Sequence, residues 1–348
     1  MNYPKVSVVL INYNGKELLE RFFISIVNLN YPDYKLIIVD NASTDASINF
    51  LKEKYPKAKV ISADKNYGTA EGGNIGARQA EGDYIFFISN DMELDKNILN
   101  FMVERMEKDK KIGICTCKMR RITEFGDKLN IIDSVGSDLD VFGFPAARGI
   151  NEKDFGQLDY FTEVFFSFGG ALLIRKDLFF EAGGYDPEVF TLADDIDLSW
   201  RVRLLGYKVV VEPKAFLYHR VSATLGSKFK RSQKRFISER NTLRMLLKDY
   251  GLFGLLFILP GYMCLLAAEV SFFLMLGKKD LSISGLRAIW WNIKYLSDTW
   301  RRRAVIQARR VMGDLAVLKC MRLKSHKLEI FMDYLKHYSS VEWRGYFG

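Results

Sequence analysis

The sequence predicts an α/β fold built on a mixed, mostly parallel β-sheet, followed by a helical C-terminal region. Apolar runs rich in β-branched residues alternate with amphipathic stretches through the first 118 residues, a rhythm typical of a parallel sheet covered by helices on both faces. Polar and acidic residues come directly after several of the apolar runs. A long apolar stretch and a basic segment follow towards the end of the chain.

The expected elements can be placed in order along the chain. Strands are expected at Val6–Ile11, Leu36–Val39, Lys59–Ser62, Tyr84–Ile88 and Ile112–Cys117. The helices between them are expected at Lys16–Val27, Ala46–Tyr55, Ala70–Ala80 and Lys96–Lys108. Residues 119–165 are less regular and predict loops and short strands around a cleft. Further on, strands are expected at Phe168–Ile174 and Tyr207–Val211, and helices at Leu178–Ala182, Ile196–Leu205 and from Ser232 onward.

The composition is that of a folded chain with an uneven charge. Of the 348 residues 49% are hydrophobic, which is enough for a sizeable core. Residues 278–348 hold 15 Lys and Arg against 6 Asp and Glu, and this accounts for the whole net charge of +9. Such a basic segment can face nucleic acid or anionic lipid. The four cysteines lack zinc-site spacing and are expected to be reduced.

Polar residues are expected at the carboxyl ends of three parallel strands, where open α/β sheets bind ligands. Asn12 follows the first strand and Asp40 follows the second. Asp40 could accept a hydrogen bond from a base or a sugar hydroxyl, or it could cap the next helix. Asn90-Asp91-Met92-Glu93 follows the fourth strand. Its carboxylates suit Mg²⁺ and, through the cation, a diphosphate. The alternative interpretation is that the motif is a solvent-exposed turn.

A third acidic site, Asp194-Asp195-Ile196-Asp197, precedes a helix. Three carboxylates within four residues repel one another, which would raise the pKa of at least one of them and suit a general base. Acids at a helix N-terminus are also common for structural reasons. His219 follows a strand-like run, and neutral histidine is a good metal ligand, although an isolated histidine is more often structural.

Taken in order, these motifs resemble the family 2 inverting glycosyltransferases, which have the GT-A fold. The resemblance covers about residues 4–245 and looks closest to the rhamnosyltransferase-type branch that builds surface polysaccharides. The motifs that carry it are Val6-Ser7-Val8-Val9-Leu10-Ile11-Asn12-Tyr13-Asn14, Ile38-Val39-Asp40-Asn41-Ala42-Ser43, Asn66-Tyr67-Gly68 with Gly72-Gly73-Asn74-Ile75-Gly76, Asn90-Asp91-Met92-Glu93, Phe168-Gly169-Gly170-Ala171, Gly183-Gly184-Tyr185-Asp186, and Asp194-Asp195-x-Asp197-Leu198-Ser199-Trp200-Arg201.

The resemblance implies a role for each matching residue. Asp40 would read the base of a nucleotide-sugar donor in a pocket lined by Asn12. Asn74, Asn90 and Asp91 would also belong to the donor site. Asp91 would bind Mg²⁺ or Mn²⁺, with Glu93 and His219 as further ligands. Asp195 matches the general base. The chain departs from the family's pattern in reading Asn-Asp-Met-Glu at the metal motif and in having Asp194 where Glu is commoner.

The implied activity is the metal-dependent, inverting transfer of one sugar from a donor such as dTDP-rhamnose or a UDP-sugar to a saccharide acceptor that is lipid-linked. A polyprenyl-phosphate or processive sugar transferase of the same fold is the nearest alternative, but no Gln-x-x-Arg-Trp motif occurs between Asp197 and Arg244. A dinucleotide-dependent oxidoreductase is disfavoured because the first strand–helix turn lacks G-x-G-x-x-G. A nucleic-acid-binding protein is disfavoured because no such motif is present.

The sequence further predicts a catalytic domain over residues 1–245 and a membrane-associated helical region over residues 246–348. Leu252–Leu276 is long enough to cross a bilayer, but it contains Pro260 and Glu269. Residues 220–250 carry nine Lys and Arg, so both flanks of the apolar stretch favour the cytoplasm. We therefore expect an enzyme at the cytoplasmic face of the membrane, in contact with anionic lipid. A helical pair packed on the catalytic domain, or at a homodimer interface, is the alternative.

Overall fold

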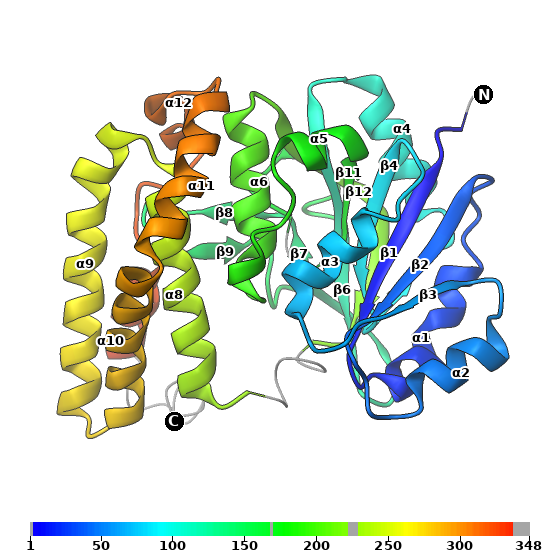
Figure 1. Cartoon of the computed structure of the whole chain (residues 1–348), viewed down its shortest axis with the longest axis horizontal. Helices are drawn as coiled ribbons and strands as arrows, with labels where there is room; N and C mark the ends of the chain where they lie inside the picture. Colours follow the sequence, from blue (N-terminus) through cyan, green and yellow to red (C-terminus); the bar gives the residue numbers. More distant parts are fainter. Residues whose placement is uncertain (1–2, 168–169, 222–228, 337–348) are drawn as a thin grey trace.

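The computed structural model describes residues 3–167, 170–221 and 229–336. Phe168 and Gly169 of the glycine-containing motif, and residues 337–348 of the expected C-terminal region, lie outside the described residues. An α/β part around a twisted sheet and a layer of long helices lie side by side (Figure 1).

The strands are β1 (Val6–Asn12), β2 (Tyr34–Asp40), β3 (Lys59–Ser62), β4 (Tyr84–Ser89), β5 (Met92–Leu94), β6 (Ile112–Ile122), β7 (Lys128–Val135), β8 (Ser137–Leu139), β9 (Pro145–Ala147), β10 (Thr162–Glu163), β11 (Leu172–Arg175) and β12 (Lys208–His219). The helices of the α/β part are α1 (Lys16–Val27), α2 (Ser47–Lys54), α3 (Gly68–Ala77), α4 (Ile98–Lys108), α5 (Lys176–Glu181), the 3-10 helix η1 (Pro187–Val189) and α6 (Asp194–Leu204). The C-terminal helices are α8 (Arg231–Asp249), α9 (Leu252–Met275), α10 (Lys279–Lys294), α11 (Leu296–Arg309), α12 (Asp314–Leu318) and α13 (His326–Lys336).

The predicted mixed, mostly parallel sheet is confirmed. Within the described residues it has ten strands, eight of them in the order β10-β12-β6-β11-β4-β1-β2-β3. The pairs β1–β2, β1–β4, β2–β3 and β6–β12 are parallel, whereas β11 runs antiparallel to β4 and β6. Three strands that carry expected site residues, β1, β2 and β4, therefore end at the same edge.

Helices cover both faces of the sheet because alternate strand residues point to opposite sides. In β1, Val8 and Leu10 join one core cluster, which includes residues of α1 and α4. Val9 joins the cluster on the other face, with residues of α3, α5 and α6. All three side chains are buried, so the short apolar run is a central strand.

Two strands are longer than the sequence predicts. β6 continues to Ile122 and β12 continues to His219, because each finds a further partner beyond the expected end. β7 pairs with the second half of β6, and β5 pairs with the end of β12. The segment predicted as irregular thus supplies β7 to β10, and the extension of β12 carries His219 to the same edge as Asp91.

A third core joins the α/β part to the C-terminal helices. Trp200 of α6 and Tyr250 at the end of α8 are buried and meet edge to face, with ring centroids 4.7 Å apart. Tyr262 and Leu266 of α9 belong to the same cluster. The division expected after residue 245 therefore falls inside α8, a helix that packs on both parts.

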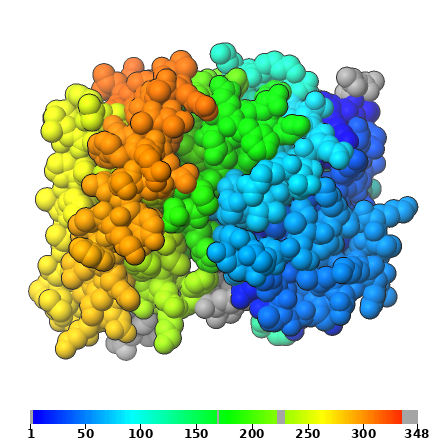
Figure 2. Space-filling view, in the orientation of Figure 1, coloured from blue at the N-terminus to red at the C-terminus, as the bar shows by residue number. Residues whose placement is uncertain are grey.

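α9 has one buried and one exposed face. Its inner face packs through Tyr262, Leu266 and Phe273, while Glu269 pairs with Arg235 of α8 at 2.6 Å. The carboxylate that argued against a simple membrane helix is thus directed into the protein. On the outer face, Phe257 is 62% exposed, and further large apolar side chains lie beside it. In Figure 2 this helix forms the outer wall of the molecule at the left.

Candidate active site

The ends of β1, β2 and β4 are tied together by a polar network. The Asn12 side chain donates from Nδ2 to Asp40 Oδ1 at 2.9 Å and accepts from Asn90 Nδ2 at 2.8 Å. Ser43 donates to the same Asp40 carboxylate through its hydroxyl at 2.6 Å and through its backbone N–H at 2.9 Å. The expected gathering of Asn12, Asp40 and Asn90 at one sheet edge is therefore present.

Asp40 and Asn12 lie beneath the surface of this edge. Both side chains are wholly buried, and the two Asp40 oxygens already accept hydrogen bonds from Asn12 and Ser43. In this arrangement Asp40 holds the turn after β2, and its expected contact with a base stays a prediction. The alternative that Asp40 caps the next helix differs from the geometry, because α2 begins later, at Ser47.

Close approach of the backbone is required at two glycines of this edge. A Cβ on Gly15 would lie 2.1 Å from Asn90 Nδ2, so the turn after β1 must lack a side chain to admit Asn90. Gly68, at the start of α3, has φ of 72° and would place a Cβ 2.1 Å from the Phe190 carbonyl oxygen. Its own carbonyl accepts from Asn41 Nδ2 at 2.9 Å. The start of α3 therefore contacts both the turn after β2 and the loop that contains Phe190.

Asn74, also expected in the donor site, has another task in this structure. Its Nδ2 donates to the Tyr185 carbonyl at 2.9 Å, and its Oδ1 accepts from the Tyr185 N–H at 2.9 Å. Nδ2 also donates to Glu71 at 2.7 Å. The amide therefore binds the backbone before η1 to α3 and does not join Asn12, Asp40 and Asn90.

Asp91 and His219 come together at the end of the sheet. His219 Nε2 lies 3.7 Å from Asp91 Oδ2, and His219 Nδ1 lies 2.8 Å from Asp133 Oδ2. Burial lowers the pKa of His219, but the hydrogen bonds and charges of Asp133 and Asp91 outweigh burial and raise this pKa to about 10. Without a cation, the imidazolium is the counter-charge of the two acids.

The same arrangement fits a divalent metal ion. A metal ion would take the place of the proton on His219 Nε2, because this nitrogen faces a carboxylate oxygen of Asp91 while Asp133 orients the imidazole from behind, as around many metal-bound histidines. No three His, Cys, Asp or Glu side chains in the described part of the chain converge as a complete ligand set. The remaining ligands would therefore come from a diphosphate and water, as is usual for Mg²⁺.

Glu93, the other expected metal ligand, does not share this position. Its Oε1 lies 2.6 Å from Lys128 Nζ, on the neighbouring strand β7. The acid is engaged in an ion pair at the rim of the sheet. Of the three expected ligands, Asp91 and His219 lie together in the described structure and Glu93 lies apart from them.

The three acids in the first turn of α6 have different surroundings. Asp197 is buried and pairs with Arg201 at 2.7 Å and Lys248 at 2.6 Å; burial raises its pKa, but these cations hold it below the usual range. Burial raises the pKa of Asp194. Asp195 is half-buried in the first turn of α6. Asp197 is thus held by two cations inside the protein, and the assignment of Asp195 as the general base stays a prediction.

The backbone before these acids is strained. Phe190, Leu192 and Ala193 have φ of 64°, 62° and 80°, values that non-glycine residues rarely adopt. At Phe190, ψ is −63° and the Thr191 N–H donates to the Val189 carbonyl at 2.8 Å, which defines the rare γ-turn of positive φ. Each such residue costs on the order of 1–3 kcal/mol, and such strain is concentrated at functional sites.

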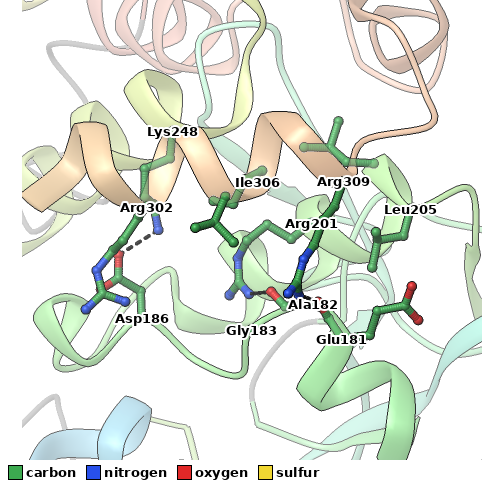
Figure 3. Close-up of a pocket in the computed structure, with 12 residues that line it drawn as sticks. Glu181, Ala182, Gly183, Asp186, Arg201, Leu205, Lys248, Arg302, Ile306 and Arg309 are labelled. Carbon is green, nitrogen blue, oxygen red and sulfur yellow. Dashed lines mark hydrogen bonds and ion pairs between the residues drawn. The ribbon is translucent and has the colours of Figure 1, made fainter.

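One cavity lies away from this edge. It has a volume of about 210 Å³ and is lined by the C-terminal ends of α5 and α6 together with α8 and α11 (Figure 3). Asp195 lies at the opposite end of α6. Most cations of the cavity are already paired: Lys248 with Asp186 at 2.6 Å, and Arg201 with Asp197. We therefore regard this cavity as part of the packing between the two parts of the chain.

Sequence reasoning missed three side chains of this region. Ser43 was within a recognised motif but was not assigned a contact with Asp40. Asp133 lies in the segment predicted as irregular, and no local signal marks it as the partner of His219. Asn241 of α8 donates to backbone carbonyls of the strained segment. Asparagine is a poor helix former, and its place in the middle of a helix was the one available signal.

Comparison with known proteins agrees with this fold. A family model described as glycosyl transferase family 2 matches residues 7–180, half of the chain. A model described as glycosyl transferase family group 2 matches residues 149–297. Poly-beta-1,6-N-acetyl-D-glucosamine synthases of Staphylococcus epidermidis and Staphylococcus aureus are 25% identical over 227 residues, which is 65% of this chain. The chain spans about half the length of these relatives, 52% in both cases.

Solved structures share the architecture at low identity. GalNAc-T7 with UDP, GalNAc and Mn²⁺ superposes with a TM-score of 0.57 at 19% identity, covering 71% of this chain and 48% of that one. The mannosyltransferase PcManGT from Pyrobaculum calidifontis, with GDP-Man and Mn²⁺, has a TM-score of 0.51 at 16% identity and covers 89% and 86%. The expected GT-A fold is thereby confirmed. With half of its length matched by the family model, the chain belongs to glycosyl transferase family 2.

Proposed function

We propose that this chain is a metal-dependent, inverting glycosyltransferase that moves one sugar from a nucleotide-sugar to a hydroxyl of a lipid-linked saccharide. The observation that carries the proposal is the meeting of Asp91, His219 and Asp133 at the sheet edge that also holds Asn12, Asp40 and Asn90. An ion site beside a polar strand-end network suits a nucleoside diphosphate. Two structural neighbours were solved with Mn²⁺ and a nucleotide or nucleotide-sugar, which supports a divalent cation here.

The proposed reaction needs no covalent enzyme intermediate. Asp195 accepts the proton of the acceptor hydroxyl while that oxygen attacks the anomeric carbon. The bond from the anomeric carbon to the donor phosphate breaks, and the nucleoside diphosphate leaves from the opposite face with the bonding electrons. A metal held by Asp91 and His219 would supply positive charge to the diphosphate. The network of Asn12, Asp40 and Asn90 would hold the strand ends beneath the donor, and Asn74 would hold the backbone before η1 against α3.

The donor is proposed to be a UDP-sugar, with UDP-N-acetylglucosamine the first to test. The Staphylococcus relatives are named for N-acetylglucosamine polymers, and the TarS structure with UDP-GlcNAc superposes with a TM-score of 0.50 at 16% identity over 70% of this chain and 67% of that one. The rhamnosyltransferase-type branch, with dTDP-rhamnose as donor, stays a second prediction from the sequence motifs. Transfer of a single sugar is favoured over polymerisation because the chain lacks a Gln-x-x-Arg-Trp motif between Asp197 and Arg244.

Location at the cytoplasmic face of the membrane is part of the proposal, with residues 1–245 catalytic and 246–348 membrane-associated. By length and composition, α9 is one helix in the described residues that could cross a bilayer, which by itself is weak support. α9 packs along α8 and α10 beside the sheet (Figure 1), so a perpendicular crossing would draw charged α8 into the bilayer as well. A helix lying in the membrane surface avoids that cost.

The chemistry of the outer surface supports this placement. The outer face of α9 carries no charged side chain but exposes Phe253, Leu256 and Phe257. On α10, Trp290 is 68% exposed and lies on a helix that also exposes Arg287 and Lys294. Apolar, tryptophan and basic residues together are typical of helices in the interface of anionic membranes. A second copy of the chain covering the same face is the competing occupant.

A donor panel tests the proposed function. Purified full-length protein would be incubated with UDP-N-acetylglucosamine, UDP-glucose, GDP-mannose or dTDP-rhamnose and a polyprenyl-diphosphate-linked saccharide, with Mn²⁺, Mg²⁺ or excess EDTA. We expect metal-dependent release of nucleoside diphosphate from one donor and a product of inverted anomeric configuration by NMR. Absence of release from every donor, with a folded protein in either metal, would refute the proposal. A product of retained configuration would refute the inverting mechanism.

A further inference from the structure

The strained segment Val189–Ala193 is held in place by a single buried asparagine. Asn241, which is 0% exposed, donates from Nδ2 to the carbonyls of Val189 at 3.0 Å, Thr191 at 2.8 Å and Leu192 at 2.5 Å. The two N–H groups of one amide thus donate to three carbonyls, which belong to the γ-turn and to the first left-handed residue after it. These carbonyls belong to backbone that would otherwise relax from its unfavourable φ values.

The orientation of the Asn241 amide is set by its neighbour. Arg240 Nε donates to Asn241 Oδ1 at 3.0 Å, which directs the Nδ2 group towards the segment. The same guanidinium donates to the Val189 carbonyl at 2.8 Å and lies over the ring of Trp291 in α10, 4.7 Å from its centroid. Since α10 fixes Arg240 and Arg240 fixes Asn241, the C-terminal helices support the segment.

The segment determines where α6 begins. Ala193, with φ of 80° and ψ of 5°, is the N-cap of α6, and its carbonyl accepts the N–H of Asp197 at 2.9 Å. No side chain caps this helix. The direction of the first turn, which carries Asp195, therefore depends on the backbone of Val189–Ala193.

The opposite side of the segment contacts the donor side of the fold. The Phe190 carbonyl accepts from the Ala70 N–H at 3.1 Å and from Thr69 Oγ1 at 3.3 Å, both in the first turn of α3. The segment is thus clamped between α3, which adjoins the turn after β2, and α8. A shift of the segment on either side would displace the N-terminus of α6.

We propose that Asn241 is a positioning residue for the acceptor-activating carboxylate Asp195, and that it links the C-terminal helices to the chemistry at the sheet edge. This inference rests on the proposed function, since it assumes that Asp195 is the base. Asn241 touches neither donor nor acceptor and acts through the backbone of Val189–Ala193. Removal of its amide should change the rate of transfer and leave donor binding intact.

The test uses two substitutions at this position in the full-length protein. Asn241→Asp keeps the shape but replaces the N–H donors by an oxygen that faces three carbonyls, and Asn241→Ala removes the group. Turnover of the donor selected in the panel, binding of UDP with Mn²⁺, and hydrogen exchange of residues 189–197 would be measured. We expect kcat to fall by about 10²-fold, the scale of a displaced catalytic group. Hydrogen exchange of the segment should be faster, and UDP affinity little changed.

Ser282→Ala is the control. Ser282 is a buried serine of α10 whose hydroxyl donates to the Val270 carbonyl of α9 at 2.8 Å, so its loss also weakens the helical layer without touching Arg240, Asn241 or the strained segment. Its kcat should stay near that of the parent. If Asn241→Ala does not fold, Asn241→Ser, which keeps one donor in a smaller side chain, takes its place.

The outcomes separate this inference from the proposed function. Parental kcat in the folded Asn241 variants, or an equal loss of kcat in Ser282→Ala, would overturn the positioning role. Weakened UDP binding with unchanged kcat would also overturn it. Normal turnover in Asp195→Asn would instead refute the assignment of the base, and with it the proposed mechanism.

Discussion

Replacement of Lys248 by methionine tests the buried charges that join the two parts of the molecule. Lys248 is 1% exposed, and its Nζ lies 2.6 Å from carboxylate oxygens of both Asp186 and Asp197. Methionine keeps much of the volume and removes the charge. Asp186 would retain Arg244 at 2.8 Å, and Asp197 would retain Arg201 at 2.7 Å, but each buried acid would lose one cation.

The expected cost follows from burial. Removing one partner of a buried ion pair destabilises a protein by about 3–5 kcal/mol, because the remaining charge stays desolvated. The matched control is Lys208→Met, where the lost partner is Asp109 at 3.0 Å and both side chains are substantially exposed. An exposed pair contributes about 0–1 kcal/mol. The two variants should therefore differ several-fold in their loss of stability.

The pH dependence gives an independent check on the cause. Burial raises the pKa of Asp186, but the positive charges of Lys248 and Arg244 outweigh burial and hold this pKa well below its usual range. The pKa of Asp197 is lowered in the same way, because the charges of Arg201 and Lys248 outweigh burial. A lowered folded-state pKa gives stability that is present above the unfolded value of about 3.9 and is lost as the pH falls below it. The deficit of Lys248→Met should be full at neutral pH and shrink under acid, when the carboxylates protonate.

Urea denaturation followed by tryptophan fluorescence, at neutral pH and near pH 3, measures the loss of stability and its pH dependence. We expect a lower midpoint for Lys248→Met at neutral pH and a smaller difference from the parent in acid. A neutral-pH loss no larger than that of Lys208→Met would refute the reasoning. A deficit that grows as the pH falls would refute the assigned cause.

Three further predictions concern the site and the surface. Asp195→Asn should lower kcat by about 10²–10⁴-fold, the usual cost of losing a general base, with UDP binding by calorimetry unchanged; near-normal turnover would contradict the assignment. Asp133→Asn should weaken activation by Mn²⁺ about 10–100-fold in a metal titration, because it orients the His219 ligand, while full activity of the parent in excess EDTA would contradict a metal site altogether. Phe253→Glu combined with Phe257→Glu should reduce co-sedimentation with anionic vesicles, whereas Phe125→Glu, at an 83% exposed phenylalanine of the α/β part, should not. Unchanged vesicle binding with loss of a dimer in analytical ultracentrifugation would identify a second copy as the occupant of that face.

The sequence by itself determined the fold class and the sheet edge that carries the site. Short apolar runs rich in β-branched or aromatic residues and bounded by polar residues favour buried strands, so strands at Val6–Ile11 and Tyr84–Ile88 could be predicted to within one residue of their ends without tertiary information. Parallel strands end at a common edge, and the meeting of Asn12, Asp40 and Asn90 follows from that rule alone. The family motifs depend on local order and spacing, which the chain displays directly.

Only the tertiary structure decided which of these polar side chains are available. Asp40 and Asn74 carry motif identities, yet their hydrogen-bonding groups are occupied by Ser43 and Asn12 in one case and by the Tyr185 backbone in the other. Glu93 forms an ion pair with Lys128. The imidazole of His219 is oriented by Asp133, which lies 86 residues earlier in the chain. The burial of a side chain and the identity of its bonding partners depend on residues that are distant in sequence, so no local pattern predicts them.

The same reason explains α9 and Asn241. Composition marks Leu252–Met275 as long and apolar, but only the packing of Arg235 against Glu269 shows which face is inward. An asparagine within α8 carries no functional signal until the strained carbonyls of Val189–Leu192 are found beside it. Local sequence determines which backbone conformations are low in energy. Contacts between distant segments determine which high-energy conformations are nevertheless stabilised.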